Sequence, residues 1–262
     1  MIEVKKLNKE FEGDAILKNI DAKFEKGLVN MIIGKSGSGK TVLLRCIVGL
    51  LAPSSGEILY DGRNFLRMKN SEIKRLRRDI GMLFQGSALF DSRTVLENVM
   101  FPLDMFSKKS FRERKKRAEF CLERVGLANS ANLYPSEISG GMMKRVAIAR
   151  AIALNPHYLF CDEPNSGLDP KTSQLIDELI NDITKDFGMT TIVVTHDMNS
   201  IMNIGDHIVY IHEGKKEWEG SKAEIMNADN ESLNEFVFAS DLFKKVKEAQ
   251  NLEDQEKLDA LK

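Results

Sequence analysis

The chain has 262 residues, of which 29% are charged, and its formal net charge is −1. This near balance excludes a strong general attraction to an anionic membrane surface or to nucleic acid, which we do not expect as a partner. No run of about 18 apolar residues occurs and no charged-then-apolar leader opens the sequence, so we expect a cytoplasmic protein that meets a membrane only through a partner. The three cysteines lack metal-ligand spacing and are expected to be buried, reduced thiols.

The first 62 residues alternate short apolar runs with turns, a pattern typical of β-strands. A glycine-rich loop follows the third run, and the apolar segment after the loop has the pattern of a buried helix. A proline-containing turn at residues 53–56 ends this helix. We therefore expect a helix that starts near residue 42, and strands at residues 2–4, 20–24, 29–33 and 56–62.

The rest of the chain alternates helical segments with buried strands, which is the pattern of an α/β protein with a parallel sheet. Residues 93–155 are helical in pattern, with breaks at glycines and at prolines such as Pro102. We expect one helix at residues 71–78, one around residues 175–183, and helical structure after residue 221. Further strands are expected at residues 80–85, 158–161 and 190–197, and a strand-turn-strand is expected at residues 208–218.

The glycine-rich loop has the spacing Gly-x-x-x-x-Gly-Lys-Thr between a strand and a helix. Glycines let successive backbone N–H groups converge on phosphate oxygens, and the dipole of the following helix adds positive potential. Lys40 can then reach the β- and γ-phosphates, and the Thr41 hydroxyl can bind Mg²⁺. A plain glycine turn between core elements is the alternative. The loop predicts a nucleoside triphosphate site formed by Gly34, Lys35, Ser36, Gly37, Ser38, Gly39, Lys40 and Thr41.

Two adjacent carboxylates, Asp162 and Glu163, follow the buried strand at residues 158–161. In open α/β sheets ligands bind at the carboxyl ends of the strands. Asp162 is therefore expected to hold Mg²⁺ beside Thr41, and Glu163 to polarise the water that attacks the γ-phosphate. An acidic turn without catalytic function is the alternative interpretation.

Three further side chains suit the same site. Gln85 ends its own strand and is expected to touch the metal or the water, and to sense the γ-phosphate. His196 lies at the end of the strand at residues 191–195 and is expected to contact that phosphate, although a lone histidine is often structural. Phe11 is expected to stack on adenine, with an ordinary core position as the alternative.

A second helix N-terminus with a hydroxyl and two glycines occurs at Ser139, Gly140 and Gly141, and it predicts a second anion site. One nucleotide does not need two such sites far apart in sequence. A homodimer that packs head to tail does, because each turn can then bind the γ-phosphate held by the other subunit. The loop at residues 165–169 is expected at that junction.

With these motifs in this order, the chain resembles the ATP-binding-cassette ATPases along residues 1 to about 220. The glycine-rich loop matches Walker A, residues 158–163 match Walker B, and residues 139–141 match the signature turn. The resemblance implies a P-loop NTPase with a RecA-like core, an antiparallel β subdomain and a helical subdomain at roughly residues 86–155. It also implies ATP and Mg²⁺ as cofactors, a homodimer closed by ATP, and a membrane permease that contacts the segment after Gln85. Further matches are Phe11 as the adenine-stacking aromatic, Gln85 as the Q-loop, residues 166–169 as the D-loop and His196 as the switch histidine.

Two traits narrow the resemblance. Met142 follows the signature turn where the family usually has glutamine, and the segment at residues 84–103 is similar to one subfamily. Both resemble the ATPase of the Mla-type, MCE-associated phospholipid transporters, which maintain outer-membrane lipid asymmetry. That subfamily implies a permease, an MCE-domain substrate-binding protein and a small STAS-like regulatory subunit. Residues 221–262 then form a C-terminal helical extension that reaches the neighbouring subunit; a solvated amphipathic tail is the alternative.

Three rival functions remain from the sequence. The nearest is the ATPase of an importer for another small solute such as an amino acid or a metal ion, since an ATPase subunit does not touch cargo. A non-transport ATPase of DNA repair or ribosomes needs long insertions or two cassettes in one chain. A non-hydrolysing nucleotide switch predicts loss of the base, yet Lys40, Glu163 and His196 are all present.

Overall fold

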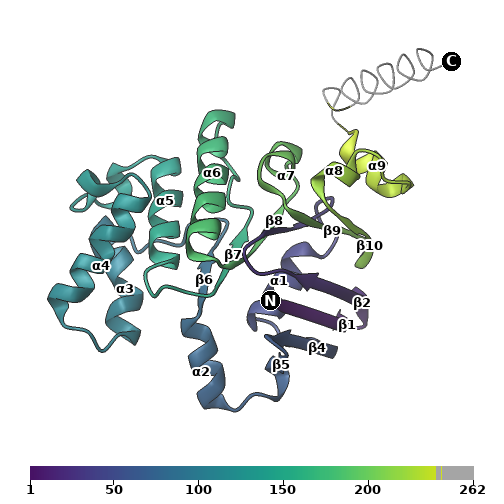
Figure 1. The fold of residues 1–262 in the computed structure, drawn as a ribbon, viewed down its shortest axis with the longest axis horizontal. Coiled ribbons are helices and arrows are strands. Elements are labelled where there is room, and N and C mark those ends of the chain that lie inside the picture. The colour runs from purple at the N-terminus through teal and green to yellow at the C-terminus, as the bar shows by residue number, and fades with distance from the viewer. Residues whose placement is uncertain (240–242, 244–262) are drawn as a thin grey trace.

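A computed structural model describes residues 1–239 and Phe243. These residues form one mixed, mainly parallel sheet and one antiparallel sheet, with helices around them (Figure 1). None of the helices described is both long and apolar enough to cross a bilayer. The predicted α/β class is confirmed.

The mixed sheet has the strand order β10-β9-β3-β8-β7-β6, and only β10 runs antiparallel to its neighbour. Every residue of β3, β7 and β8 is buried, because helices or the second sheet cover both faces. The loops that follow these three strands leave the sheet at one shared edge. The strands are β3 (Val29–Ile33), β6 (Ile80–Leu83), β7 (Tyr158–Asp162), β8 (Thr190–Thr195), β9 (His207–His212) and β10 (Lys215–Gly220).

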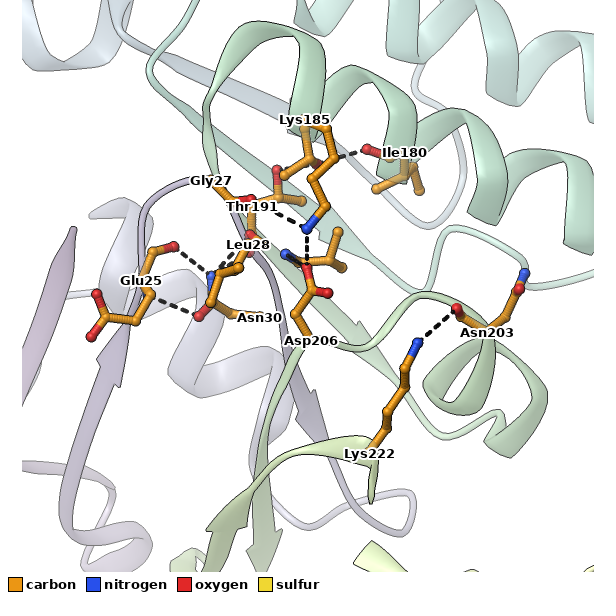
Figure 2. Close-up of polar contacts among 12 residues, drawn as sticks. Glu25, Gly27, Leu28, Asn30, Ile180, Lys185, Thr191, Asn203, Asp206 and Lys222 are labelled. Carbon is orange, nitrogen blue, oxygen red and sulfur yellow. Dashed lines mark hydrogen bonds and ion pairs between the residues drawn. The ribbon is translucent and has the colours of Figure 1, made fainter. Parts of the chain in front are cut away.

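A polar network at the opposite, N-terminal ends of these strands fixes where they begin (Figure 2). The Asn30 side chain is fully buried; its amide donates to the carbonyl oxygens of Glu25 and Thr191 at 2.9 and 3.0 Å. Its own oxygen accepts from the Glu25 N–H at 2.8 Å. Lys185 forms an ion pair of 2.6 Å with Asp206, which links a helix to the start of β9. The pairing register of β3 with its neighbours is thereby anchored on the edge away from the glycine-rich loop.

The antiparallel sheet has the order β2-β1-β4-β5 and packs with α1 (Lys40–Val48) over one face of the parallel sheet. The Tyr60 hydroxyl donates to the Ile47 carbonyl at 2.8 Å and so joins β4 to α1. The first strand is longer than the predicted residues 2–4. Register shifts after Val4 and Leu7 interrupt the alternation of apolar and polar side chains, so the sequence pattern predicts only the start of the strand. The strands are β1 (Ile2–Phe11), β2 (Asp14–Phe24), β4 (Ser55–Tyr60) and β5 (Arg63–Asn64).

Three helices, α3 (Val95–Phe106), α4 (Phe111–Arg124) and α5 (Gly140–Ala151), pack against one another beside β6 (Figure 1). The predicted break at Pro102 is wrong, because α3 runs through it with Val99 and Leu103 buried, and this packing outweighs the proline. The other elements before residue 205 are α2 (Asn70–Arg78), α6 (Pro170–Phe187) and α7 (Met198–Ile204), and the short 3₁₀ helices η1 (Phe65–Arg67), η2 (Ala128–Ser130) and η3 (Pro135–Glu137).

The chain after residue 220 continues as α8 (Lys222–Ile225) and α9 (Glu231–Val237), which pack on the last strands of the mixed sheet. The Tyr210 hydroxyl donates to the Ser232 carbonyl at 2.9 Å, and Leu233 is fully buried. This part is an integral piece of the core. Residues 240–242 and 244–262, with the predicted contact to a neighbouring subunit, lie outside the described residues.

Candidate functional site

The glycine-rich loop connects β3 to α1 at the shared strand edge. A Cβ on Gly34 would lie 2.2 Å from the Ile211 carbonyl oxygen, so no larger residue fits there. Gly39 has φ +102° and caps α1 without a side-chain hydrogen bond, which leaves the first N–H groups of α1 without a side-chain cap. The buried Ser38 hydroxyl likewise has no hydrogen-bond partner among the described residues. An anion would satisfy these donors.

Lys40 and Thr41 start α1 and lie against the loop and β7. Lys40 is 6% exposed, and its ammonium donates to the carbonyl oxygens of Gly34 and Lys35 at 2.8 and 2.9 Å. Burial lowers the pKa of Lys40, while the charges of Glu163 and Asp162 oppose the shift. The Thr41 hydroxyl donates to a carboxylate oxygen of Asp162 at 3.1 Å. The structure thus brings together the two residues predicted to hold the metal.

Glu163 and His196, predicted as base and phosphate contact, touch each other. The His196 Nδ1 lies 2.8 Å from a Glu163 carboxylate oxygen. Because an ionised carboxylate only accepts hydrogen bonds, Nδ1 carries the proton in this pair. Glu163 has φ +48°, a left-handed conformation that costs a non-glycine residue about 1–3 kcal/mol. With this backbone conformation, the carboxylate reaches His196, the residue that follows β8.

The loop after Glu163 is held by a buried carboxylate that no pattern in the sequence predicts. Asp177 of α6 is 3% exposed and accepts from the Asn165 amide at 2.7 Å. The same amide nitrogen donates to the Ser200 hydroxyl of α7 at 3.0 Å. Burial raises the pKa of Asp177 to about 6, while hydrogen bonds from Asn165 and Ser200 oppose the shift. These contacts fix the loop that begins at the predicted base.

Gln85 lies just beyond β6, and its side-chain amide donates to the Ser166 hydroxyl at 3.2 Å. The structure therefore places it against the predicted D-loop. Its backbone carbonyl accepts a hydrogen bond from the buried ammonium of Lys144 on α5. Arg150 of the same helix donates to the carbonyl oxygens of Ser87 and Ala88 at 2.7 and 2.6 Å. Neither cation was predicted, because their partners are 59 to 63 residues away in sequence.

Ser139, Gly140 and Gly141 lie at the start of α5. The Ser139 hydroxyl caps the helix by accepting from the Met142 N–H at 3.2 Å. A Cβ on Gly141 would lie 2.5 Å from the Thr172 methyl carbon, so close packing against α6 already requires glycine there. The predicted second anion site thus has a structural constraint that the sequence does not reveal.

A groove of about 1100 Å³ opens between the glycine-rich loop and the carboxyl ends of β7 and β8. Lys35 and Ser36 line one part, and Glu163 and His196 another. Of the described residues that line it, none belongs to the Ser139 turn. Within one copy of the chain, the Ser139 turn is therefore not part of this groove, and neither Lys40 nor Thr41 lines it.

Phe11 ends β1 with 42% of its surface exposed, so the alternative of a core position is wrong. The Lys9 ammonium lies 4.6 Å from the centre of the Phe11 ring. The lysine occupies one face of this exposed ring, so a planar base would stack on the other face or displace the lysine. Stacking on adenine stays a prediction.

The donor set fits Mg²⁺. Thr41 and Asp162 present hydroxyl and carboxylate oxygens, the hard ligands this ion prefers. Among the described residues, no group of three or more histidine, cysteine, aspartate or glutamate side chains forms an all-protein metal site. The ion would therefore complete its coordination with phosphate oxygens and water, as Mg²⁺ does in nucleotide sites.

Comparisons with known proteins agree with this geometry. The ABC transporter family model matches residues 17–166, more than half of the chain. The methionine import ATP-binding protein of Carboxydothermus hydrogenoformans is 43% identical over 90% of this chain and 71% of its own length. The L-cystine import ATP-binding protein of Bacillus subtilis is 41% identical over 88% of this chain and 94% of its own length.

Solved structures give the same result. The dimeric structure of a bacterial ABC transporter cassette has a TM-score of 0.77 at 37% identity and covers 85% of this chain and 99% of that one. A dimeric post-hydrolysis state of the same cassette, bound to ADP and phosphate, has a TM-score of 0.76.

The site and the fold define an ATP-binding cassette, and the chain belongs to the ABC transporter family. It is the ATPase subunit of such a transporter, a class whose cassettes dimerise and pair with a membrane permease. The names of these two relatives, which are ATP-binding proteins for the import of methionine and of cystine, do not support the finer resemblance to Mla-type ATPases.

Proposed function

We propose that ATP binds the loop at residues 34–41, with Lys40 on the β- and γ-phosphates and Thr41 and Asp162 holding Mg²⁺. The observation that carries this proposal is the meeting of Lys40, Thr41, Asp162 and Glu163 at one edge of the sheet. When bound, the ion neutralises developing charge on the phosphates. Gln85 completes the site from the neighbouring strand when the Ser166 contact is exchanged for metal or water.

Glu163 is the proposed base. Its carboxylate orients a water molecule for attack on the γ-phosphorus and accepts a proton from it. The bond between the γ-phosphorus and the bridging oxygen breaks, and that oxygen leaves with ADP. His196 holds the Glu163 carboxylate through Nδ1–H, and a hydrogen bond from this ring to the γ-phosphate requires a proton on Nε2 as well. The exposed fraction of the His196 side chain, 63%, leaves the ring able to turn towards that phosphate.

We further propose that two copies pack head to tail, each placing its Ser139, Gly140 and Gly141 turn on the other's γ-phosphate. The turn lies outside the groove of its own chain, which supports a site completed by a second copy. Its serine and glycines present backbone N–H groups at a helix start, as an anion requires. Phosphate release then separates the copies.

For the cargo we propose phospholipid, moved through an Mla-type permease with an MCE-domain substrate-binding protein and a small STAS-like subunit. Met142 after the signature turn and the segment at residues 84–103 support this proposal. In that assembly the chain sits on the cytoplasmic face of the inner membrane.

The second candidate is import of an amino acid, which the names of the relatives favour over lipid transport. The two cargoes predict different partners for the same ATPase. Isolating the membrane complex and identifying its subunits and bound molecules separates them. An MCE-domain protein with co-purified phospholipid supports the first candidate. A solute-binding protein whose amino acid stimulates phosphate release supports the second.

The ATPase proposal itself is tested by phosphate release from the purified complex with Mg²⁺ and ATP. Steady release that stops when Mg²⁺ is chelated agrees with the proposed site. Nucleotide binding without release, even with the permease present, would mean that the chain acts as a switch.

A further inference from the structure

We infer that Lys144 is a positioning residue that ties the loop at Gln85 to the carboxylate pair Asp162 and Glu163. This inference rests on the proposed function of those carboxylates. Lys144 lies outside all the matched motifs, and its proposed role is to couple the loop at Gln85 to the site.

The position of Lys144 supports the tether. It lies about one helical turn after Gly141, on α5, and only 4% of it is exposed. Its ammonium donates to the Gln85 carbonyl. A lysine side chain seldom gives up its hydration unless charged or polar partners replace the water. The carbonyl supplies one such partner, and the pairing of Leu83 with Cys161 brings the end of β7 beside the loop that carries this carbonyl.

The electrostatics support the second half of the inference. Burial lowers the pKa of Lys144, and electrostatic interactions with Cys161, Asp162 and Glu163 act in the opposite direction. Lys40, from α1, interacts with the same two carboxylates. Two buried lysines from different helices therefore interact electrostatically with the carboxylates at the end of β7. Lys40 has a phosphate to bind, whereas Lys144 stays available to balance the carboxylates.

Arg150 extends the contact along the same helix. Its guanidinium holds the carbonyl oxygens of Ser87 and Ala88, two non-glycine residues with φ of +62° and +49°. A left-handed pair persists only when its surroundings hold it in place. Through hydrogen bonds from Lys144 and Arg150, α5 thus holds the loop that starts at Gln85. A displacement of this loop by a partner would move α5 and shift the Lys144 ammonium relative to the carboxylates.

Three substitutions separate the hydrogen bond from the charge. Lys144→Arg keeps both, Lys144→Gln keeps a donor for the Gln85 carbonyl but removes the charge, and Lys144→Met removes both. Arg145→Gln is the matched control, because Arg145 lies on the same helix and donates instead to the Val125 carbonyl at 3.2 Å. Thermal melting of each variant verifies that it is folded.

Two measurements report the two roles. Hydrogen exchange of the Ser87 and Ala88 amides reports the tether, and we expect about a fivefold acceleration in Lys144→Met but not in Lys144→Gln. The Mg²⁺ concentration that half-saturates ATP binding reports the charge. It should fall about fivefold in Lys144→Gln and Lys144→Met, because a cation no longer repels the metal, and stay unchanged in Lys144→Arg and in the control.

Wild-type exchange in a folded Lys144→Met variant would overturn the tether. An unchanged Mg²⁺ requirement in both neutral variants would overturn the charge role. If the wild-type chain bound no ATP with Mg²⁺, the proposed function would fail, while the exchange measurement would still test the tether.

Discussion

Gly141→Ala should destabilise the protein through a contact with α6. The added Cβ would lie 2.5 Å from the Thr172 methyl carbon, about 1 Å inside an ordinary contact distance. Thr172 cannot turn away freely, because its hydroxyl and N–H both bind the Asp169 carboxylate, at 2.5 and 3.0 Å. Overpacking of this kind costs about 1–3 kcal/mol, and the higher helix propensity of alanine returns up to about 1 kcal/mol. The expected net loss is about 1–2 kcal/mol.

Urea unfolding followed by circular dichroism and by fluorescence of the single tryptophan, Trp218, measures this loss. Thr172→Ser is the matched partner, because serine keeps the hydroxyl for Asp169 and lacks the methyl group. Combined with Gly141→Ala it should recover most of the lost stability. A Gly141→Ala variant as stable as the wild type, or a double variant no more stable than the single one, would refute the steric reasoning.

Three further predictions concern the site. Lys40→Ala should abolish ATP binding by calorimetry, because the phosphates lose their main cation; wild-type affinity would contradict the loop assignment. Glu163→Gln should bind ATP normally and release phosphate at least about 100-fold more slowly, since the base contributes about that much; an unchanged rate would place the base elsewhere. Asp177 binds its proton more tightly when folded, because its pKa rises from 3.8 to about 6. The free energy of unfolding should therefore fall by at most about 3 kcal/mol as pH rises from about 4 to about 6. Asp177→Asn should remove this pH dependence in urea titrations. The same pH dependence in the variant would assign the effect to other groups.

The sequence predicted the parts of the site whose geometry is local. A strand, a glycine loop and a helix start are adjacent in the chain, so Lys40 and Thr41 could be placed without any tertiary contact. Asp162 was also predictable, because a buried apolar run that ends in an acid points to the carboxyl edge of a sheet.

The sequence did not predict the groups that hold the site in place. Lys144 and Asp177 read as ordinary helix residues, and their partners come from distant segments. The left-handed backbone of Glu163 has no sequence signal either, since glutamate rarely adopts it. The helix through Pro102 shows the same limit, because packing against α4 and α5 decided the outcome.

A cross-linking measurement addresses most directly whether two chains share each nucleotide. Cysteines placed at Ser36 and at Ser139 in the Glu163→Gln background lie in surface positions, whereas the three native cysteines are buried. With ATP and Mg²⁺, a short bis-maleimide should join the Ser36 position of one copy to the Ser139 position of the other and give a covalent dimer, and without nucleotide it should not. Monomer alone under both conditions, with the permease bound as well, would contradict the shared site.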